Sequence, residues 1–416
     1  MVLPPVNPMF ISVTDTSRNP ARSGIQTVVR GLVAGMTQLG RDFKLVTWSP
    51  KRSAFTLLRP DRSRHVGLRH RPDNRWLPLS WLVSSERRRI FLRAGGQNYR
   101  VPIHDHPAYR RNLPNGWLLL PEVIYGGELR HSIGYARDSG LRVAAILHDA
   151  IPVSHPDMVD VKAAEQHAEY LRALSQSDLF FATSRHAAQG YGDLIENNSR
   201  EKVPLRVCAL PGEILDSPRQ VTLTDTGQTT VSILCVSTLE PRKNHQLLIE
   251  AFEEVRRSKP DLDLYLDLVG DAYAASPQIA ASVADAVKRN PRIRWHGKVE
   301  ADALRQFYRR SSFTVYPSFL EGFGLPVLES LWFGKPCICA NFGAMGENAA
   351  GGGCLPVDVR NGQALANGIL TLAAQPELRR SLAEQAIHRR LKTWKDYAME
   401  ICSTLDAFRP GDLTAP

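Results

Sequence analysis

Short apolar runs alternate along the chain with longer stretches in which apolar residues recur every three or four positions. The short runs have the length of buried strands, and the longer stretches have the spacing of amphipathic helices. In the first half, these patterns predict strands at Met9–Thr14, Lys44–Thr47, Gly116–Leu120, Arg142–Leu147, Leu179–Thr183 and Leu205–Ala209, and helices at Ile25–Leu39, Gly126–Ser139 and Ala163–Gln176. In the second half, they predict strands at Val231–Val236, Asp263–Val269, Ile293–His296, Phe313–Tyr316, Pro336–Ala340 and Gly353–Pro356, and helices at Asn244–Ser258, Pro277–Lys288, Ala301–Arg310, Leu325–Phe333 and Gln363–Ala374. Alternation of strand and helix predicts an α/β fold with parallel sheets covered on both faces.

The length of the chain indicates two such domains. A single hydrophobic core seldom grows beyond about 300 residues, and this chain has 416. Between the halves, Pro211–Thr230 is rich in Pro, Gly, Asp and Thr and has little periodicity, which predicts a linker that we place at 213–230. We therefore expect doubly wound, Rossmann-like domains at 1–212 and 231–395 that face a cleft, and a C-terminal helix in 396–416 that packs back toward the first domain.

Composition is that of a soluble globular protein. Hydrophobic residues make up 43% and charged residues 23% of the chain, and no apolar run approaches the roughly 20 residues of a transmembrane helix. The first residues lack the basic and apolar regions of a signal peptide. None of the six cysteines forms a CxxC pair, so we expect reduced thiols in a cytoplasmic protein. The sequence contains no zinc spacing, Walker loop or serine-hydrolase elbow.

The clearest chemical pattern is EGFGLPVLE, which runs from Glu321 to Glu329. It follows a predicted strand and begins a predicted helix, and Gly322 and Gly324 let the backbone approach a ligand closely. First-turn amides can bind an anion such as a diphosphate, and here they are those of Phe323, Gly324 and Leu325. The alternative is an acidic helix start that needs no ligand. The complete strand–turn–helix unit favours a ligand site.

A second pattern, STLEPRKNH at 237–245, lies between the first strand and the first helix of the second half. Arg242 and Lys243 can neutralise a diphosphate, Arg as a planar fork and Lys as a point charge. Alone, such a pair is more often a solvated surface, but its place in a chain that also contains EGFG favours a ligand site. Gly270, in the turn after the next strand, is a weaker candidate, and His296 is weaker still.

Two loops in the first half also follow predicted strands. The helix that opens at Gly24, after Ser23, has an N-terminus suited to an anion, with a plain strand–helix turn as the alternative. His148 and Asp149 end a strand at its carboxyl end, where ligands bind. A lone His is more often structural, but this position favours contact with a substrate, and Asp149 can orient His148 or cap a turn. For Thr183–His186 we expect a structural role.

Together these segments resemble the retaining glycosyltransferases of the GT-B fold, specifically glycosyltransferase family 4. EGFGLPVLE is similar to the E-x7-E signature of that family, EPRKN to its diphosphate-binding segment, and HDAIP to its H-D-x-x-P segment. The resemblance implies a nucleotide-diphospho sugar as donor and no metal or other cofactor. The chain departs from many members at Ser23, where they have Gly, and at Ser237-Thr238, where they have Gly-Arg.

The resemblance also implies roles for individual residues. Glu321 would contact hydroxyls of the donor sugar, Glu329 would bind the nucleotide ribose, and His148 would contact the donor sugar or the acceptor. Arg242 and Lys243 would stabilise the departing diphosphate. The other donor-binding residues that it implies are Gly24, Ser237, Gly270, Gly322, Phe323, Gly324 and Leu325. Because no carboxylate is assigned as nucleophile, we expect front-face attack, in which the donor phosphate takes the acceptor proton.

The start of the chain, DTS followed by SGIQTVVR, resembles bacterial enzymes that build surface polysaccharides, often mannosyl- or rhamnosyltransferases. This favours GDP-mannose as donor and a glycan or polyprenyl-diphosphate-linked glycan as acceptor. The other functional class that we consider is a catalytically inactive module of the same fold that binds a nucleotide or glycan. Such a module need not retain all four of Glu321, Glu329, Arg242 and Lys243.

The positive charge of the chain is concentrated in one stretch. The net charge is +10, and Lys51 to Arg111 contains fifteen Lys and Arg but four acids. Within it, Arg75–Val83 has two Trp and Arg87–Arg89 follows, a composition that suits an anionic membrane at the inner face of the plasma membrane. The alternatives are a solvated basic face and a packed part of the first domain. We expect no nucleic-acid partner, because no recognised module is present.

Overall fold

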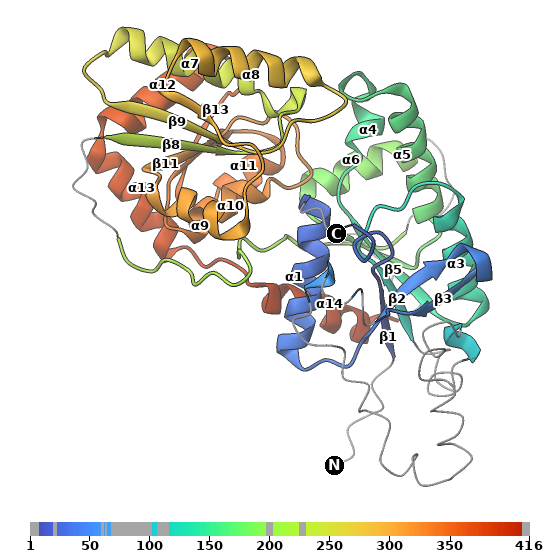
Figure 1. Cartoon of the computed structure of the whole chain (residues 1–416). Helices are drawn as coiled ribbons and strands as arrows, with labels where there is room; N and C mark the ends of the chain where they lie inside the picture. The colour runs from blue at the N-terminus through green and yellow to red at the C-terminus, as the bar shows by residue number, and fades with distance from the viewer. Residues whose placement is uncertain are drawn as a thin grey trace. The chain divides into compact units, whose positions relative to one another are not determined.

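The computed structural model describes residues 8–19, 23–59, 62, 65–67, 102–105, 116–196, 203–223 and 230–409. The chain forms two compact units (Figure 1). The first comprises residues 1–183, 188–209 and 394–416, and the second comprises 184–187 and 210–393. Each unit has its own sheet.

The first unit is built on a seven-stranded sheet of order β3-β2-β1-β4-β5-β6-β7. Its strands are β1 Met9–Ser12, β2 Lys44–Ser49, β3 Ala54–Leu57, β4 Trp117–Leu120, β5 Arg142–Leu147, β6 Leu179–Ala182 and β7 Leu205–Val207. The α-helices that begin in the first half are α1 Gly24–Leu39, α3 Gly127–Asp138, α4 Ile151–Ser154, α5 Val161–Leu174 and α6 Arg185–Glu196. Strands β1, β4 and β6 are buried along their whole length, as expected for a sheet covered on both faces.

The second unit is built on a six-stranded parallel sheet of order β10-β9-β8-β11-β12-β13. Its strands are β8 Val231–Val236, β9 Leu264–Val269, β10 Ile293–Trp295, β11 Phe313–Tyr316, β12 Cys337–Ala340 and β13 Cys354–Val357. Its α-helices are α7 His245–Ser258, α8 Pro277–Arg289, α9 Ala301–Arg310, α10 Leu325–Trp332, α11 Gly343–Ala349, α12 Gly362–Ala374 and α13 Pro376–His388. Helices α7, α8 and α12 lie on one face of the sheet, and α9, α10 and α13 lie on the other (Figure 1).

The predicted strands and helices are all present, with boundaries shifted by at most a few residues. One expectation was incomplete: β3 was not predicted, and it pairs with β2 in the antiparallel direction. The connection between them is a short 3-10 turn at Pro50–Arg52 closed by Ser53 in the left-handed region at φ 45°. A connection this short can only return the chain antiparallel, because parallel neighbours need a long crossover. Helices α4, α6, α11 and α13 were also not predicted.

The C-terminal helix α14, Trp394–Ala407, belongs to the first unit and packs along α1 (Figure 1). Two glycines of α1 make the close approach possible. A Cβ on Gly31 would lie 2.1 Å from the ring of Trp394, and one on Gly35 would lie 2.1 Å from the carbonyl oxygen of the same residue. Trp394 is fully buried, so this interface forms part of the core of the unit.

The described part of the segment predicted as linker packs on the second unit. The indole Nε1 of Trp332 donates to the carbonyl oxygen of Ser217 at 3.1 Å. Arg219 donates to the carbonyl oxygens of Ala386 and Ile387, at 3.0 Å each. These carbonyls belong to the last turn of α13, where they have no partner within the helix. Residues 224–229 lie outside the described part.

In each sheet the strand order changes direction at one position, between β1 and β4 in the first and between β8 and β11 in the second, although the strands that meet there are parallel. In open α/β sheets, ligands bind beyond the carboxyl ends of the strands at such a position. The residues that follow β8 and β11 are the segments that contain EPRKN and EGFG. Those that follow β1 and β4 contain Asp15 and Glu122.

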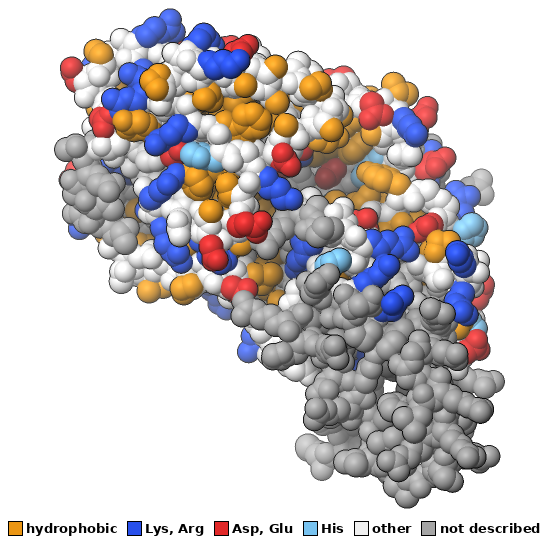
Figure 2. All heavy atoms as spheres, in the orientation of Figure 1, with side chains coloured by type: hydrophobic (Ala, Val, Ile, Leu, Met, Phe, Trp, Pro, Cys, Tyr) orange, Lys and Arg blue, Asp and Glu red, His pale blue; other side chains and the backbone are white. Residues whose placement is uncertain are grey.

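Positive and negative side chains are interspersed over the described surface in the view of Figure 2. The basic stretch with its Trp residues, Arg75–Val83 and Arg87–Arg89, lies outside the described residues. None of the helices that the structure describes is both long enough and apolar enough to cross a bilayer. The six cysteines are buried and form no disulfide.

Candidate active site

In the second unit, a tight turn presents Arg242 and Lys243 just after β8. Pro241 starts a 3-10 turn, which suits its fixed φ, and Asn244 ends it in the left-handed region at φ 59°. Asn is one of the few residues other than Gly that adopts this conformation readily. The Asn244 side chain also donates to the carbonyl oxygen of Val359 at 2.8 Å, which anchors the turn. The sequence PRKN thus specifies the local geometry.

Glu321 is the centre of a buried cluster that this turn completes. Its Oε1 accepts hydrogen bonds from the hydroxyls of Tyr316, at 2.8 Å, and Ser318, at 2.7 Å, and from the ammonium group of Lys243. Its Oε2 pairs with a terminal nitrogen of Arg242 at 2.8 Å. Glu321 is 8% exposed and Lys243 is also buried. Tyr316 ends β11 and Arg242 follows β8. These two strands are neighbours in the sheet, so their carboxyl ends bring the two motifs together.

The charges in this cluster keep Glu321 ionised. Burial acts to raise its pKa, but the positive charges of Lys243 and Arg242 outweigh burial and hold the pKa at about 2. Arg242 also pairs with Glu240 through Nε at 2.9 Å. Burial lowers the pKa of Arg242, yet the two carboxylates raise it further than burial lowers it. The cluster therefore holds two cations and two carboxylates.

The hydrogen bonds of the cluster leave defined groups for a ligand. Glu321 has three donors on Oε1 and one on Oε2, so a lone pair of Oε2 remains. Arg242 uses Nε and one terminal nitrogen within the described part, which leaves the other terminal nitrogen. Lys243 donates to Glu321 and Tyr316 and has a third N–H. One acceptor and two donors can therefore still bind a substrate.

The glycine turn after Glu321 opens helix α10. Gly324 is its N-cap at φ 85°, in the left-handed region, and no side chain caps the first turn. Phe323 is buried, and its carbonyl oxygen accepts from Asn348 at 2.6 Å. Gly322 is buried as well, and Leu325 is the first, half-buried residue of the helix. The first-turn amides of α10 therefore have no capping side chain.

Glu329 lies in the second turn of α10, where the hydroxyl of Tyr308 donates to its Oε2 at 2.9 Å. Burial raises the pKa of Glu329. The Tyr308 ring stacks on Phe333 with ring centroids 5.2 Å apart. Glu329 is only partly buried by surface area, so its carboxylate can still reach a ligand.

Gly270 has a packing reason to be glycine. Its φ is 154°, and a Cβ there would lie 1.9 Å from the carbonyl oxygen of Ser237. The hydroxyl of Ser237 lies 3.0 Å from Nε2 of buried His245, and burial together with the charge of Lys243 lowers the His245 pKa to about 3. His296 pairs with Asp267 at 2.7 Å. Intramolecular contacts thus account for Gly270, Ser237 and His296 without a ligand.

In the first unit, residues next to its N-terminus cap helix α1. Ser23 is the N-cap, and its amide donates to Oε1 of Gln26 at 3.1 Å in a capping box. Gln26 in turn donates through Nε2 to Asp15 at 3.0 Å. A Cβ on Gly24 would meet no heavy atom within 4 Å. Gly24, unlike Gly270, therefore has no packing reason to be glycine.

His148 follows β5, and its Nε2 lies 2.9 Å from the carbonyl oxygen of Pro121. A carbonyl only accepts, so Nε2 carries the proton and Nδ1 is the acceptor in the neutral ring. Burial lowers the pKa of His148, which favours that neutral form. Asp149 accepts from the amide of Ile151 at 3.1 Å and so caps the turn, one of the two roles predicted for it. The hydroxyl of Thr183 donates to the His148 carbonyl.

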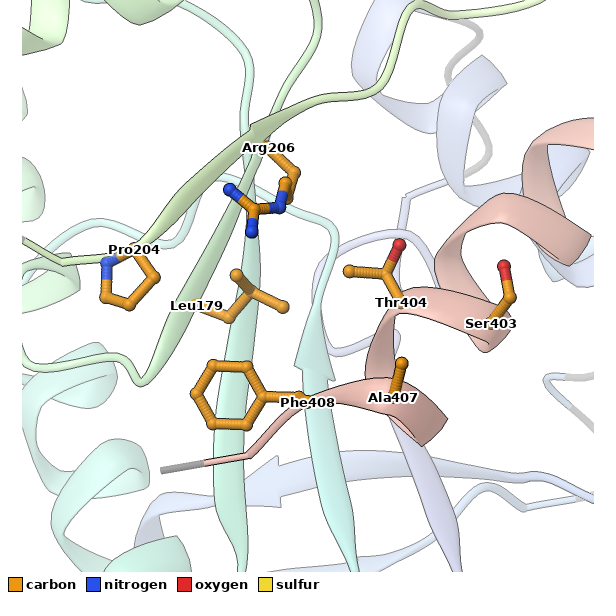
Figure 3. A pocket seen from close by; sticks show the side chains of 7 residues that line it. All are labelled: Leu179, Pro204, Arg206, Ser403, Thr404, Ala407 and Phe408. Carbon is orange, nitrogen blue, oxygen red and sulfur yellow. The ribbon is translucent and has the colours of Figure 1, made fainter. Parts of the chain in front are cut away.

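The first unit contains a hollow of about 320 Å³ (Figure 3). Its lining consists of Leu179, Pro204, Arg206, Ser403, Thr404, Ala407 and Phe408. Leu179 starts β6 and Pro204 precedes β7, so the hollow is at the amino ends of these strands. His148 follows the carboxyl end of β5, at the opposite edge of the sheet. The lining has no carboxylate or imidazole, and we assign it no catalytic role.

Several residues of the site were not found by sequence reasoning. Tyr316 and Ser318 bind Glu321, Glu240 pairs with Arg242, and Tyr308 binds Glu329. Two signals were available in the sequence: Tyr316 is a polar residue at the end of a predicted strand, and Glu240 begins the EPRKN segment. In the part of the chain that the structure describes, no three His, Cys, Asp or Glu side chains are grouped to hold a metal ion.

Residues 224–389 match the family described as glycosyl transferases group 1. The chain is 31% identical over 176 residues to the O-antigen chain mannosyltransferase B of Escherichia coli. The aligned part covers 41% of this chain and 43% of that protein. It is 24% identical over 216 residues to the serotype-specific mannosyltransferase WbdA of Escherichia coli, and here the aligned part covers 49% of this chain and 26% of that protein. The chain thus spans less than half the length of these relatives.

Among solved structures, the chain is similar to Anabaena Alr3699/HepE in complex with UDP and glucose. The TM-score is 0.65 at 14% sequence identity, and the match covers 97% of this chain and 100% of that one. Likeness at this identity concerns the fold alone. The two Rossmann-like units and this match show the GT-B fold, which confirms the predicted fold class.

Proposed function

We propose that this chain, whose residues 224–389 belong to the group 1 glycosyl transferases, transfers a sugar from a nucleotide-diphospho sugar to a glycan acceptor with retention of configuration. The observation that supports the proposal most strongly is the buried cluster of Glu321, Lys243 and Arg242 at the reversal point of the second sheet. It combines an ionised hydrogen-bond acceptor with two cations, and such a combination suits a sugar joined to a diphosphate.

In this proposal, Arg242 and Lys243 stabilise the leaving diphosphate. Breaking the bond between sugar and phosphate places negative charge on the diphosphate, and preorganised donors aimed at that charge lower the barrier. The terminal nitrogen of Arg242 and the third N–H of Lys243 are such donors. Amides in the first turn of α10, which no side chain caps, add to them. Glu329 would bind the ribose of the nucleotide.

Glu321 binds the donor sugar and does not transfer protons in this scheme. With a pKa of about 2 it is an acceptor only, so it cannot act as a general acid near neutral pH. Its remaining Oε2 lone pair suits a sugar hydroxyl. Because both of its oxygens are held by donors, it is a poor nucleophile, which favours front-face attack with the donor phosphate as the base. No step requires a metal ion.

The first unit supplies His148 and Gly24 in the proposal. Neutral His148 presents Nδ1 as an acceptor for a hydroxyl of the donor sugar or the acceptor. Gly24 leaves open space at the start of α1, where a phosphate or a sugar can approach the backbone. The substrate-binding set that we propose consists of these two positions in the first unit and, in the second unit, of Gly322, Phe323, Gly324 and Leu325, which lead into α10.

For the substrates, we propose GDP-mannose and a glycan or polyprenyl-diphosphate-linked glycan of a surface polysaccharide. The two relatives are named as mannosyltransferases, one of them of the O-antigen chain. The solved structure with a similar fold contains UDP and glucose instead, so UDP-glucose is the donor to compare. Contact with an anionic membrane, through the basic stretch, is part of the proposal and would bring the enzyme to a lipid-linked acceptor.

A panel of GDP-, UDP-, dTDP- and ADP-sugars tests the proposal in two steps. A donor that binds the native state at 100 times its Kd stabilises it by about 2.7 kcal/mol, which raises the melting temperature. Transfer of the same sugar to an acceptor should then fall by about 100-fold or more in Lys243→Ala, and not in Lys288→Ala, which removes an exposed lysine of α8. A melting shift without transfer to any acceptor would indicate the binding module instead. Full transfer by Lys243→Ala would exclude the assigned role.

A further inference from the structure

Glu122 is a buried carboxyl group at the reversal point of the first sheet. It follows β4 by two residues, next to the end of β1, and it is 1% exposed. Its Oε2 accepts hydrogen bonds from the backbone amides of Asp15, at 2.8 Å, and Thr16, at 2.9 Å. These are the amides of the loop that leaves β1. The side chain of Glu122, which follows β4, therefore holds the loop that follows the neighbouring strand β1.

From that loop, a chain of hydrogen bonds leads to the start of α1. The Asp15 carboxylate accepts from Gln26 Nε2 at 3.0 Å, and Oε1 of the same Gln26 accepts from the amide of Ser23 at 3.1 Å. Ser23 is the N-cap immediately before Gly24. The position of the α1 N-terminus thus depends on Asp15, and the backbone of Asp15 depends on Glu122.

The residue before Glu122 fixes the other predicted group of this edge. The carbonyl oxygen of Pro121 accepts from Nε2 of His148 at 2.9 Å. That bond sets which nitrogen of the imidazole carries the proton and how the ring is oriented. Glu122 therefore holds the loop before α1, and the adjacent Pro121 holds the ring of His148.

Oε1 of Glu122 and the hydroxyl of Thr16 are buried and make no hydrogen bond among the residues that the structure describes. Burial is the main cause that raises the pKa of Glu122 to about 8, and the negative charge of nearby Asp15 adds to it, against the amides of Thr16 and Asp15, which lower it. A buried carboxyl that is left half satisfied costs stability.

We propose that Glu122 is a positioning residue for the transfer reaction: it holds the loop that begins α1 and the backbone that orients His148 in one fixed arrangement. This inference rests on the proposed function. Glu122 itself is buried and does not touch a substrate. It acts through Gly24 and His148, and a displacement of either by about 1 Å can lower catalysis by about 100-fold.

The test compares Glu122→Ala and Glu122→Gln in the full-length protein, with Glu165→Ala as control, which removes an exposed carboxylate of α5. Hydrogen–deuterium exchange of the peptide covering residues 13–26 reports the loop without any substrate. We expect faster exchange in Glu122→Ala, which has no acceptor for the two amides, and nearly unchanged exchange in Glu122→Gln and the control. Unchanged exchange in Glu122→Ala would overturn the inference.

Steady-state transfer provides the second readout. The kcat of Glu122→Ala should fall about tenfold or more, and Glu122→Gln should restore it to within about threefold of wild type, because the amide oxygen can accept the same two bonds. Wild-type kcat should also decline as pH rises through about 8, since an ionised Glu122 is repelled by Asp15, and Glu122→Gln should lack that decline. Asp15 is the charged neighbour that acts on Glu122, while His148 lies beyond Pro121.

Two failures can be told apart. If wild type transfers sugar and Glu122→Ala matches its kcat despite faster exchange, the positioning role is wrong and the proposed function stands. If wild type neither binds nor transfers any sugar nucleotide, the proposed function is wrong, and Glu122 loses the reaction that it was proposed to serve.

Discussion

Replacing Glu321 by Gln tests the charge balance of the second unit most directly. The substitution keeps the shape of the side chain and an oxygen that can accept from Tyr316 and Ser318. It removes the negative charge that faces Lys243 and Arg242. Arg242 keeps Glu240 as an ion-pair partner. Buried Lys243, by contrast, then has no carboxylate among its described hydrogen-bond partners.

The magnitude follows from the pKa of Glu321. The folded protein lowers this pKa from 4.5 to about 2, which corresponds to about 3 kcal/mol of stability at neutral pH. The sign follows from linkage: a depressed pKa contributes stability that is present above pH 4.5 and is lost as pH falls toward 2. The difference between wild type and Glu321→Gln should therefore be largest near pH 7 and fall to roughly half by pH 3.

Calorimetry at several pH values measures this difference. In a domain of 150–250 residues, about 3 kcal/mol lowers the melting temperature by roughly 6–12 °C. The matched control is Glu240→Gln, which removes the other carboxylate that pairs with Arg242. Glu240 is more exposed, at 20% of its side chain, so its loss should cost less than about 1 kcal/mol.

The outcome that would refute this reasoning is a Glu321→Gln melting temperature within about 2 °C of wild type at pH 7. A difference that stays constant between pH 7 and pH 3 would also contradict it, because the cost would then not come from the charge. Transfer by this variant should be strongly reduced as well, since Gln cannot balance the two cations.

Three further predictions concern single sites. Gly24→Ala should fold with unchanged or slightly higher stability, because a Cβ there meets no atom, and yet lose transfer activity if a substrate approaches this backbone; full activity would remove Gly24 from the substrate-binding set. Gly31→Ala, on the same helix, should destabilise the first unit by about 2 kcal/mol or more in denaturant unfolding, because the added methyl group overlaps Trp394; an unchanged midpoint would show that α14 can move away. Glu329→Ala should raise the KM for the donor and cost about 1–3 kcal/mol by leaving the Tyr308 hydroxyl without its partner; an unchanged KM would argue against a role at the ribose.

The spacing of apolar residues was sufficient to predict most helices and strands, because their buried positions recur with the period of the element. Strands β5, β8 and β11 and helix α9 have the boundaries that the sequence predicted. The antiparallel strand β3 was missed, because its direction is set by the tight turn at Pro50–Ser53 and its pairing with β2. Helix α13 was missed for a related reason: its outward face is polar and few of its residues are buried.

For the site, the sequence by itself predicted which residues would bind a diphosphate sugar, and it placed them on turns that the structure contains. The motifs EPRKN and EGFG specify a left-handed Asn244, a left-handed Gly324 and an uncapped helix start through local backbone preferences. Such preferences depend on neighbouring residues, so they can be read along the chain.

Only the tertiary structure decided how these residues are paired. Lys243 and Glu321 are 78 residues apart in sequence, and Asp15 and Glu122 are 107 apart; each pair meets because the strand order reverses beside it. Their ionisation depends on burial and on charges that the fold brings close, which no local pattern contains. The same reason explains why Gly270 and Gly24, both of them candidate loop glycines, differ: a Cβ on Gly270 would lie 1.9 Å from the carbonyl oxygen of Ser237, and one on Gly24 would meet no heavy atom within 4 Å.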